Sequence, residues 1–243
     1  LALNKKQVDK LSLPLMSAVN KARMQTAFTV SIEARKGITT GISAFDRAKT
    51  IKVAINNNVK KNDIVSPGHV FPLVARNGGV LERAGHTEAS VDISKLANMN
   101  PSSVICEVMN EDGRMARLDD LLKFAKKHKL KIASIEDLIS YRLKNEKLIS
   151  KIKSKKIQIK KFGIFNLNIF TNKLDNLNHL SITKGNFVLN KSTRVRVISI
   201  NKFDKLENLK NKIFIKSIKY LSQFNNFACP PFFFFIAQYS FSY

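Results

Sequence analysis

Residues 66–93 read SPGHVFPLVARNGGVLERAGHTEASVDI, and this stretch decides how we interpret the fold and the chemistry of the chain. Its most informative part is a basic loop that also carries a histidine, Arg83-Ala84-Gly85-His86-Thr87. The guanidinium of Arg83 can offer two N–H groups to a phosphate, and Gly85 lets backbone N–H groups approach the same anion. His86 is a potential metal ligand or proton carrier, and Thr87 adds a hydroxyl group. The loop therefore predicts a phosphate-and-metal site.

Charge is unevenly distributed along the 243 residues. Residues 1–142 carry 23 Lys and Arg against 14 Asp and Glu, a net charge of +9. Residues 143–243 carry 19 against 4, which supplies +15 of the total of +24. A nucleic-acid surface would be basic, but no groove-reading motif accompanies these lysines. We therefore expect no specific nucleic-acid partner, and a non-catalytic basic scaffold or RNA-binding protein is the alternative function.

The two cysteines, Cys106 and Cys229, form neither a CxxC pair nor a disulfide framework, so a reducing, cytoplasmic location is expected. No signal peptide and no run of about 18 apolar residues is present, so we expect no membrane segment. The chain begins on Leu1 instead of Met, and we expect its true N-terminus to be missing.

Hydrophobic periodicity and turn signals divide the first part of the chain into short elements. Strands are expected at 28–32, 69–75, 89–93, 103–109 and 131–135. Helices are expected at 44–57, at 118–129, and after Ser134, which can cap a helix opened by Glu136 and Asp137. A strong turn signal is Asn110-Glu111-Asp112-Gly113. Strands interleaved with helices predict an α+β fold in which helices cover a mixed sheet.

The remaining 101 residues follow a different pattern, which we expect to be a basic, poorly formed C-terminal extension. Residues 143–161 are rich in lysine and predict a solvated helix tail or linker. Residues 162–200 contain strand-like runs at 162–170 and 192–200. From Asn201 onward no period persists, and residues 201–243 are interpreted as a degenerate tail.

Two residues are candidates for acid–base chemistry. His69 is either a hydrogen-bonded structural imidazole or a functional base. Glu107 lies in an apolar run, and burial of a carboxylate costs several kcal/mol unless it is paired or protonated. It therefore occupies either a surface-facing strand position or a functional site. Its neighbour Cys106 is expected to be a buried small apolar residue instead of a nucleophile.

Less specific signals surround these residues. Glu88 and Asp92 are either metal ligands or members of salt bridges, and salt bridges are favoured. A hydroxyl-rich segment precedes the first expected long helix, and it is either an anion cradle or an ordinary helix cap: Thr39, Thr40, Gly41 and Ser43.

Several long motifs resemble one enzyme family in the same order and spacing. They are FTVSIEARKGITTGISAFDRAKTI (28–51), the stretch 66–93, VICEVMNEDGRMAR (104–117) and IASIEDLISYR (132–142). Residues 1–142 thus closely resemble 3,4-dihydroxy-2-butanone 4-phosphate synthase of riboflavin biosynthesis. The resemblance implies a lyase that converts D-ribulose 5-phosphate to 3,4-dihydroxy-2-butanone 4-phosphate and formate with Mg²⁺ (or Mn²⁺). It also implies a three-layer α–β–α arrangement around a mixed sheet, and a homodimer.

The same resemblance assigns roles to individual residues. The segment Arg83, Ala84, Gly85, His86 and Thr87 matches the family's substrate-phosphate loop, and His86 matches its histidine metal ligand. His69 and Glu107 match the two residues essential to catalysis, with Glu107 also at the substrate, and Thr40 matches the region that holds the phosphate. His69 would supply the base for enolisation, and Glu107 would move protons in the later rearrangement.

Two departures from the family patterns limit the expected activity. Family members carry an acidic loop, Asp-Glu-x-Arg-Glu-Asn-Glu-Gly-Asp, which supplies a glutamate metal ligand, and nothing in residues 1–27 matches it. We therefore expect little synthase activity from residues 1–243 alone. Residues 161–197 weakly resemble the opening of a GTP cyclohydrolase II domain, but its zinc-binding cysteines are absent, so no cyclohydrolase activity is expected.

Overall fold

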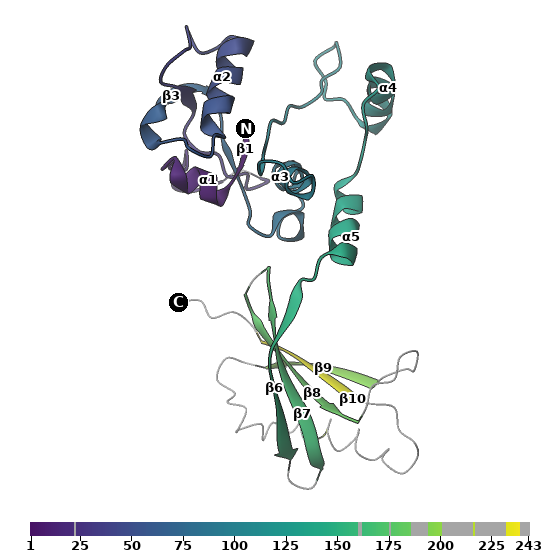
Figure 1. The fold of residues 1–243 in the computed structure, drawn as a ribbon. Coiled ribbons are helices and arrows are strands. Elements are labelled where there is room, and N and C mark those ends of the chain that lie inside the picture. The colour runs from purple at the N-terminus through teal and green to yellow at the C-terminus, as the bar shows by residue number, and fades with distance from the viewer. Residues whose placement is uncertain are drawn as a thin grey trace. The chain divides into compact units, whose positions relative to one another are not determined.

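The computed structural model of the chain describes residues 1–21, 23–159, 162–174, 176–185, 194–200, 216 and 232–238 (Figure 1). The chain forms two compact units, Leu1–Asn145 and Glu146–Tyr243, and each is described by itself. The boundary falls close to residue 142, where the sequence predicts that the first domain ends.

The first unit combines short strands with helices, which confirms the α+β class. Its helices are α1 (Lys5–Lys10), α2 (Ala44–Ala54), α3 (His86–Leu96), α4 (Leu118–His128) and α5 (Ile135–Asn145), with 3₁₀ turns at Lys61–Asp63 and Gly79–Leu81. Its strands are β1 (Ala2–Asn4), β2 (Ile32–Ala34), β3 (Ile64–Val70), β4 (Leu73–Ala75) and β5 (Ser102–Ser103). One sheet has the order β4-β1-β5, in which β1 runs parallel to β4 and antiparallel to β5. The other sheet pairs β2 with β3 in antiparallel fashion.

Strand β1 is the centre of the packing in this unit because its alternate residues enter two different clusters. Successive side chains of a strand point to opposite faces of the sheet. Ala2 is fully buried in a cluster with Ala75 and with Val91 of α3. Leu3 is fully buried in a larger cluster that draws residues from α1, α2, β2 and β3: Val8, Leu11, Ile32, Ala54, Val59, Ile64 and Val70. Both faces of this short strand are therefore covered.

Residues 89–93 form part of helix α3, so the strand expected there is wrong. The β-branched residues Val91 and Ile93 suggested a strand, but the buried positions follow helical spacing. Thr87 and Glu88 are buried, and the next buried pair one turn later is Val91 and Asp92. Packing of Val91 against β1 and β4 decides the outcome over local propensity.

The segment after α3 contains less strand than the sequence predicts. Only Ser102 and Ser103 pair as β5, residues 104–108 are irregular, and residues 131–134 form no strand. The predicted turn at 110–113 is confirmed, because the Gly113 N–H donates to the Asn110 carbonyl at 2.9 Å. Helix α4 follows, although none of its residues is buried. Ser134 caps α5 as predicted, with the Asp137 N–H donating to its Oγ at 3.0 Å.

The second unit is built on a five-stranded sheet with the order β6-β7-β8-β10-β9 (Figure 1). The strands are β6 (Ile149–Ile159), β7 (Gly163–Asn172), β8 (Asn178–Lys184), β9 (Arg194–Ile200) and β10 (Phe232–Gln238). β7 and β9 confirm the predicted strand-like runs. Most of the expected linker at 143–161 is instead strand β6, because isoleucines recur between its lysines. Part of the expected tail at 201–243 is strand β10, and the rest of that tail, apart from Lys216, lies outside the described residues.

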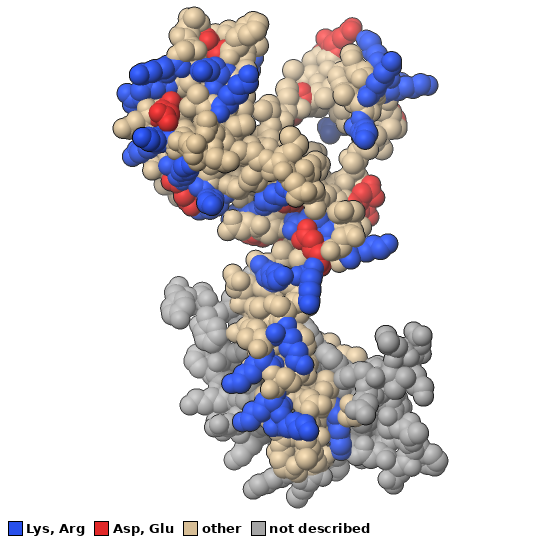
Figure 2. Space-filling view, viewed as in Figure 1, with Lys and Arg blue, Asp and Glu red and all other residues tan. Residues whose placement is uncertain are grey.

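Strand β6 lies at an edge of this sheet and carries four lysines and no acidic residue (Figure 2). All four are exposed: Lys151, Lys153, Lys155 and Lys156. Lysines on an edge strand discourage pairing with a strand of another molecule. This physical role gives the local basic charge a structural explanation.

Within the described part of the chain, the helices are too short to cross a membrane. The longest of them, such as α2 and α3, have 11 residues. A bilayer span needs about 20 apolar residues in a helix.

Replacement of Leu3 tests the two-faced packing of β1. Leu3→Ala should lower the free energy of unfolding by about 2–5 kcal/mol, because it leaves a cavity in a fully buried cluster. Leu118→Ala on α4 is the matched control, since Leu118 is 64% exposed, and it should change stability by less than about 0.5 kcal/mol. Urea denaturation followed by circular dichroism measures both, and equal losses would contradict the proposed core.

Candidate active site

His69 lies near the end of strand β3, on its exposed side, and its ring is held by one partner. The Nδ1 atom hydrogen-bonds to the Oε1 atom of Glu33, which lies on the neighbouring strand β2. The Glu33 side chain is only 15% exposed, whereas that of His69 is 43% exposed. The Nε2 atom has no hydrogen-bond partner among the residues that the structure describes. The imidazole is therefore anchored through Nδ1, and Nε2 remains available to accept a hydrogen bond from a substrate.

The loop before α2 lies against the Glu33 carboxylate. Gly41 has a φ of +86°, and a Cβ at this position would lie 1.7 Å from Oε1 of Glu33. Only glycine allows this close approach in this backbone conformation. Thr40, the residue next to Gly41, is exposed. The structure therefore places the loop of Thr40 beside the Glu33–His69 pair.

Asp46 in the first turn of α2 fixes that loop. Its carboxylate accepts hydrogen bonds from the Thr39 hydroxyl at 2.7 Å and from the backbone N–H groups of Thr39 at 3.2 Å and Gly41 at 3.0 Å. The bond from the Thr39 hydroxyl lowers the pKa of the Asp46 carboxyl most, and the N–H bonds lower it further against the opposing effect of burial. Ser43 caps the helix by accepting from the Asp46 N–H at 3.0 Å. The hydroxyl-rich segment is thus a helix cap, the second of the two interpretations.

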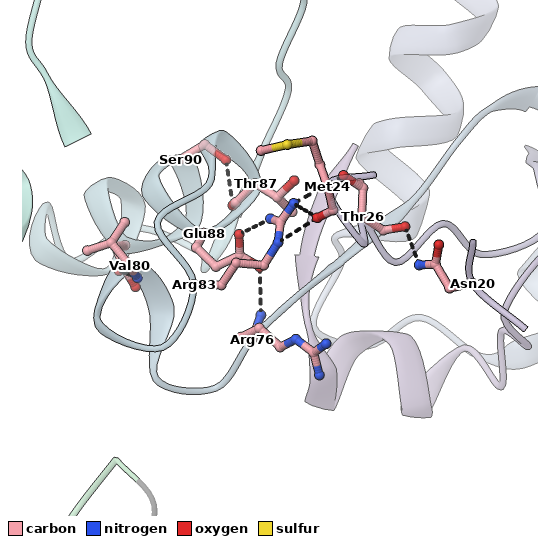
Figure 3. A network of polar contacts seen from close by, with 10 residues as sticks. Asn20, Met24, Thr26, Arg76, Val80, Arg83, Thr87, Glu88 and Ser90 are labelled. Atoms are coloured by element: carbon pink, nitrogen blue, oxygen red, sulfur yellow. Dashed lines mark hydrogen bonds and ion pairs between the residues drawn. The ribbon is translucent and has the colours of Figure 1, made fainter. Parts of the chain in front are cut away.

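Arg83 is the centre of a second polar network (Figure 3). Its Nη1 donates to Oε2 of Glu88 at 2.5 Å, and its Nη2 donates to the Met24 carbonyl at 2.7 Å and to the Thr26 hydroxyl at 3.1 Å. The other oxygen of Glu88 accepts from the Arg76 N–H at 3.1 Å. Glu88 is almost completely buried, so this ion pair ties the start of α3 to residues 24–26. The N–H groups of Arg83 were expected to bind a phosphate, but in this arrangement they bind protein groups.

The beginning of α3 supplies a different kind of anion-binding group. Gly85 is the residue before the helix and provides no side-chain cap. The backbone N–H groups of His86, Thr87 and Glu88 have no acceptor among the described residues. Unpaired N–H groups and the helix dipole make such a helix start attractive to a phosphate. Ala84 and His86 are exposed here, and Thr87 is buried with its carbonyl accepting from Ser90 Oγ at 3.0 Å (Figure 3).

Asp92 and Glu88 hold the structure together through ion pairs, as the sequence favoured. Asp92 is 3% exposed and accepts from Arg142 Nη1 at 2.7 Å and from the Val80 N–H at 2.8 Å. Arg142 also donates to the Gly78 carbonyl at 2.8 Å. This contact fastens α5 to the turn that precedes the Arg83 loop.

Glu107 and Cys106 are both exposed in the irregular segment 104–108. The expectation of a buried Cys106 is wrong, because the strand that would have buried it does not form. In the parts of the chain that the structure describes, no hydrogen bond or ion pair connects Glu107 with His69, Arg83 or His86. The structure thus joins Thr40 to the surroundings of His69 and joins Arg83 to the start of α3, while Glu107 lies by itself.

The described residues do not provide a complete ligand set for the metal expected at His86. Over the described ranges, no three His, Cys, Asp or Glu side chains are grouped as metal ligands. Mg²⁺ prefers several oxygen ligands, and one histidine does not satisfy it. The nearest carboxylate in sequence, Glu88, is occupied by Arg83. The described residues therefore do not fit a magnesium site by themselves.

A separate cavity of about 320 Å³ lies between the end of β2 and helix α2. It is lined by Arg35, Lys36, Lys49, Val53, Asn56, Asn58, Val59, Asn62 and Asp63. None of the predicted site residues lines it. Its cations make it a competing place for small anions.

Sequence reasoning missed Glu33 and the exact task of Asp46. Glu33, like Glu107, is an acidic residue within a strand-like run. This interruption was the available signal for Glu33. Asp46 follows Ser43 by three residues, a spacing that predicts a cap. Neither signal names the partner, because Glu33 meets His69 only through the pairing of β2 with β3.

Comparison with known proteins identifies the family of the chain. The family model for 3,4-dihydroxy-2-butanone 4-phosphate synthase matches residues 1–141, so the chain belongs to this family and the resemblance noted above is confirmed. The synthase of Neisseria meningitidis serogroup B is 49% identical over 197 residues, which is 81% of this chain and 54% of that protein. The riboflavin biosynthesis protein RibBA of Aquifex aeolicus is 49% identical over 201 residues, which is 82% of this chain and 49% of that protein. The chain thus spans about half the length of these curated relatives.

One solved structure extends the likeness over both units. RibBX, a two-domain 3,4-dihydroxy-2-butanone 4-phosphate synthase from A. baumannii, matches 99% of this chain and 67% of its own with a TM-score of 0.74 and 39% identity. A 3,4-dihydroxy-2-butanone 4-phosphate synthase in complex with two magnesium ions matches 59% of this chain and 72% of its own, with a TM-score of 0.54 and 35% identity.

Acid unfolding tests the role of Asp46. A carboxyl whose pKa is lowered in the folded state stabilises the protein fully above the unfolded-state pKa of about 3.9, and this contribution is lost as the pH falls through the lower folded value. Asp46→Asn should therefore be less stable than the wild type at pH 6, and the difference should shrink at pH 3. Urea denaturation at the two pH values measures this.

The control for that experiment is Asp9→Asn, which removes an exposed carboxylate whose partner is Lys5 on the same helix. Exposed pairs of this kind contribute less than about 1 kcal/mol. A stability difference between wild type and Asp46→Asn that is the same at pH 6 and pH 3 would contradict the assigned role.

Proposed function

We propose that this chain is a lyase of riboflavin biosynthesis that converts D-ribulose 5-phosphate to 3,4-dihydroxy-2-butanone 4-phosphate and formate. Membership of the synthase family supports this reaction. The structural observation that carries it is His69, which is anchored through Nδ1 while Nε2 is free. An imidazole held in this way is suited to remove a proton next to a carbonyl near neutral pH.

Substrate binding in this proposal combines three segments. The N–H groups at the start of α3, within the loop Arg83, Ala84, Gly85, His86 and Thr87, receive the phosphate. Thr40, whose loop lies beside the Glu33–His69 pair, contributes its hydroxyl to the same substrate. Glu107 contacts the substrate and moves protons after enolisation, and its position in the exposed segment 104–108 lets it approach without disturbing a packed sheet.

His86 is the one residue that we propose as a ligand of a divalent metal ion. The relative whose structure contains two magnesium ions supports Mg²⁺, with Mn²⁺ as the substitute. Further oxygen ligands have to complete the site, because His86 belongs to no group of three or more potential ligand residues in the described part of the chain.

Architecture and setting complete the proposal. The burial of Ala2 against α3 and of Leu3 against α1 supports a three-layer α–β–α arrangement of the first unit. For the second unit we propose no cyclohydrolase activity, with Lys-rich β6 as a solubilising edge of a basic extension. The reducing cytoplasm is the proposed location.

A homodimer is proposed because large apolar side chains are exposed on the first unit. Examples are Phe45 at 87% and Met99 at 69% exposure. Exposed apolar patches commonly mark association surfaces. Light scattering should give a mass twice the 27.5 kDa of the chain, and a mass of 27.5 kDa over the whole concentration range would contradict the dimer.

Formate release tests the proposed reaction. The chain preceded by a segment with the family's acidic loop should release formate from D-ribulose 5-phosphate with Mg²⁺, and residues 1–243 alone should release little. In the active form, His69→Ala should lower the rate by about 10²- to 10⁴-fold, the usual contribution of a general base. His128→Ala, which replaces a histidine at the end of α4, is the matched control and should keep the rate.

Two results would contradict the lyase. One is the absence of formate from both forms with either metal. The other is tight, sequence-selective RNA binding that survives about 0.2 M salt, since binding by a merely lysine-rich surface falls steeply with salt. The second result would favour the basic scaffold or RNA-binding alternative.

A further inference from the structure

The cavity between the end of β2 and helix α2 is bordered by three cationic side chains and one carboxylate. Arg35 and Lys36 follow β2, Lys49 lies on α2, and the carboxylate belongs to Asp63. Within the described part of the chain, none of these four side chains takes part in an ion pair. Three cations and one carboxylate give the lining a net charge of +2. A cleft with an excess of one charge attracts ions of the opposite charge.

Arg35 is held so that one end of its guanidinium stays accessible. Its backbone N–H donates to the Asp63 carbonyl at 2.9 Å, and its side-chain Nε donates to the Asn62 carbonyl at 2.6 Å. Both acceptors lie in the 3₁₀ turn that precedes β3. The Nη1 and Nη2 atoms have no acceptor among the residues that the structure describes. These two nitrogens match the spacing of two phosphate oxygens, and the bond at Nε orients them in advance.

Three asparagines add neutral hydrogen-bond donors to the same cavity: Asn56, Asn58 and Asn62. The Oδ1 atom of Asn56 accepts from the Asn58 N–H at 2.8 Å, so the amide nitrogen is the donor that remains. The apolar part of the lining consists of Val53 and Val59, and the lining contains no aromatic side chain that could stack on a base. The cavity therefore offers charge and N–H groups, which suit an oxyanion.

The cavity is built on the packed core of the first unit. Val59 is 4% exposed and belongs to the main cluster together with Ala54 and Ile64. Pairing of Ala34 with Ile64 fixes the end of β2 immediately before Arg35. A site whose groups are fixed before binding loses less conformational entropy when a ligand enters.

We propose that this cavity binds the phosphate group of a small phosphorylated molecule, at a site separate from the one assigned to D-ribulose 5-phosphate. Arg35 binds the phosphate through Nη1 and Nη2, Lys36 and Lys49 balance its charge, and the asparagine amides donate to it. A phosphate monoester carries about −1.5 to −2 charges at pH 7, which matches the net charge of the lining. The volume of about 320 Å³ is that of a small-molecule pocket, so there is room beyond the phosphate. This binding is independent of formate release.

Inorganic phosphate and glycerol 3-phosphate are the probes, each titrated into the full chain at constant ionic strength and followed by ¹H–¹⁵N spectra. The reporters are the side-chain amide signals of Asn56, Asn58 and Asn62 and the Nε–H signal of Arg35. We expect both probes to shift these signals together and to saturate them with a single dissociation constant for each probe. Chloride should give no saturable shift, because ionic screening changes gradually with concentration.

Two lysines on α2 give a matched pair of variants. Lys49→Ala should weaken the binding of both probes about 10-fold, the usual loss for a charge-assisted hydrogen bond, and Arg35→Ala should weaken it at least as much. Lys52→Ala removes the same charge from an exposed position on the same helix, but Lys52 does not line the cavity. It should change the dissociation constant by less than about twofold, because salt screens a charge outside the site.

The site is refuted if phosphate gives no saturable shift of the cavity signals in the wild type, a result that requires no variant to fold. Shifts restricted to the N–H groups at the start of α3 would also refute it. Equal weakening by Lys49→Ala and Lys52→Ala would reduce the effect to general electrostatic attraction and overturn the proposal. Saturation by phosphate without saturation by glycerol 3-phosphate would overturn the phosphorylated ligand.

Discussion

The antiparallel pairing of β2 with β3 is the constraint on which the proposed site depends. It brings Glu33 and His69 together although they are separated by 36 residues of sequence. The register shifts between Ile32 and Glu33, and the buried residues Ile32 and Val70 are paired on one side of this irregularity. Such irregularities re-aim side chains at functional positions. Burial of Ile32 and Val70 in the main cluster thus stabilises the pairing that orients the polar pair.

The polar network around Arg83 determines which groups of its loop remain available to a phosphate. The guanidinium of Arg83 donates hydrogen bonds to Glu88, Met24 and Thr26, and the buried carboxylate of Glu88 neutralises its charge. Removal of one partner of such a buried pair costs several kcal/mol, because the remaining charge is left without compensation. Arg83 therefore shapes the loop, and in the proposed site the N–H groups at the start of α3 are the ones that remain for an anion. The resemblance to the family points to this loop, and the contacts give its members different physical roles.

Several signals that depend on residues close in sequence predicted the structure correctly, whereas features set by long-range packing were missed. The turn at 110–113, the helix α4 and the cap at Ser134 depend on neighbours within a few residues, so the sequence predicts them. Val91 and Ile93 suggested a strand, but packing against β1 makes this segment a helix. Strand β10 pairs with β8 and β9, which are distant in sequence, and no local period announced it. Glu33 was missed for the same reason, since its partner is set by strand register.

The proposed sugar-phosphate site has two poles, with His69 at the reacting end and the start of α3 at the phosphate end. Its most direct test is a titration of D-ribulose 5-phosphate followed by ¹H–¹⁵N spectra of the full chain. We predict that the His69 ring and the N–H groups of His86, Thr87 and Glu88 shift together with a single dissociation constant. Shifts confined to the basic cavity of Arg35, Lys36 and Lys49, or spread over the lysines of β6, would contradict the account.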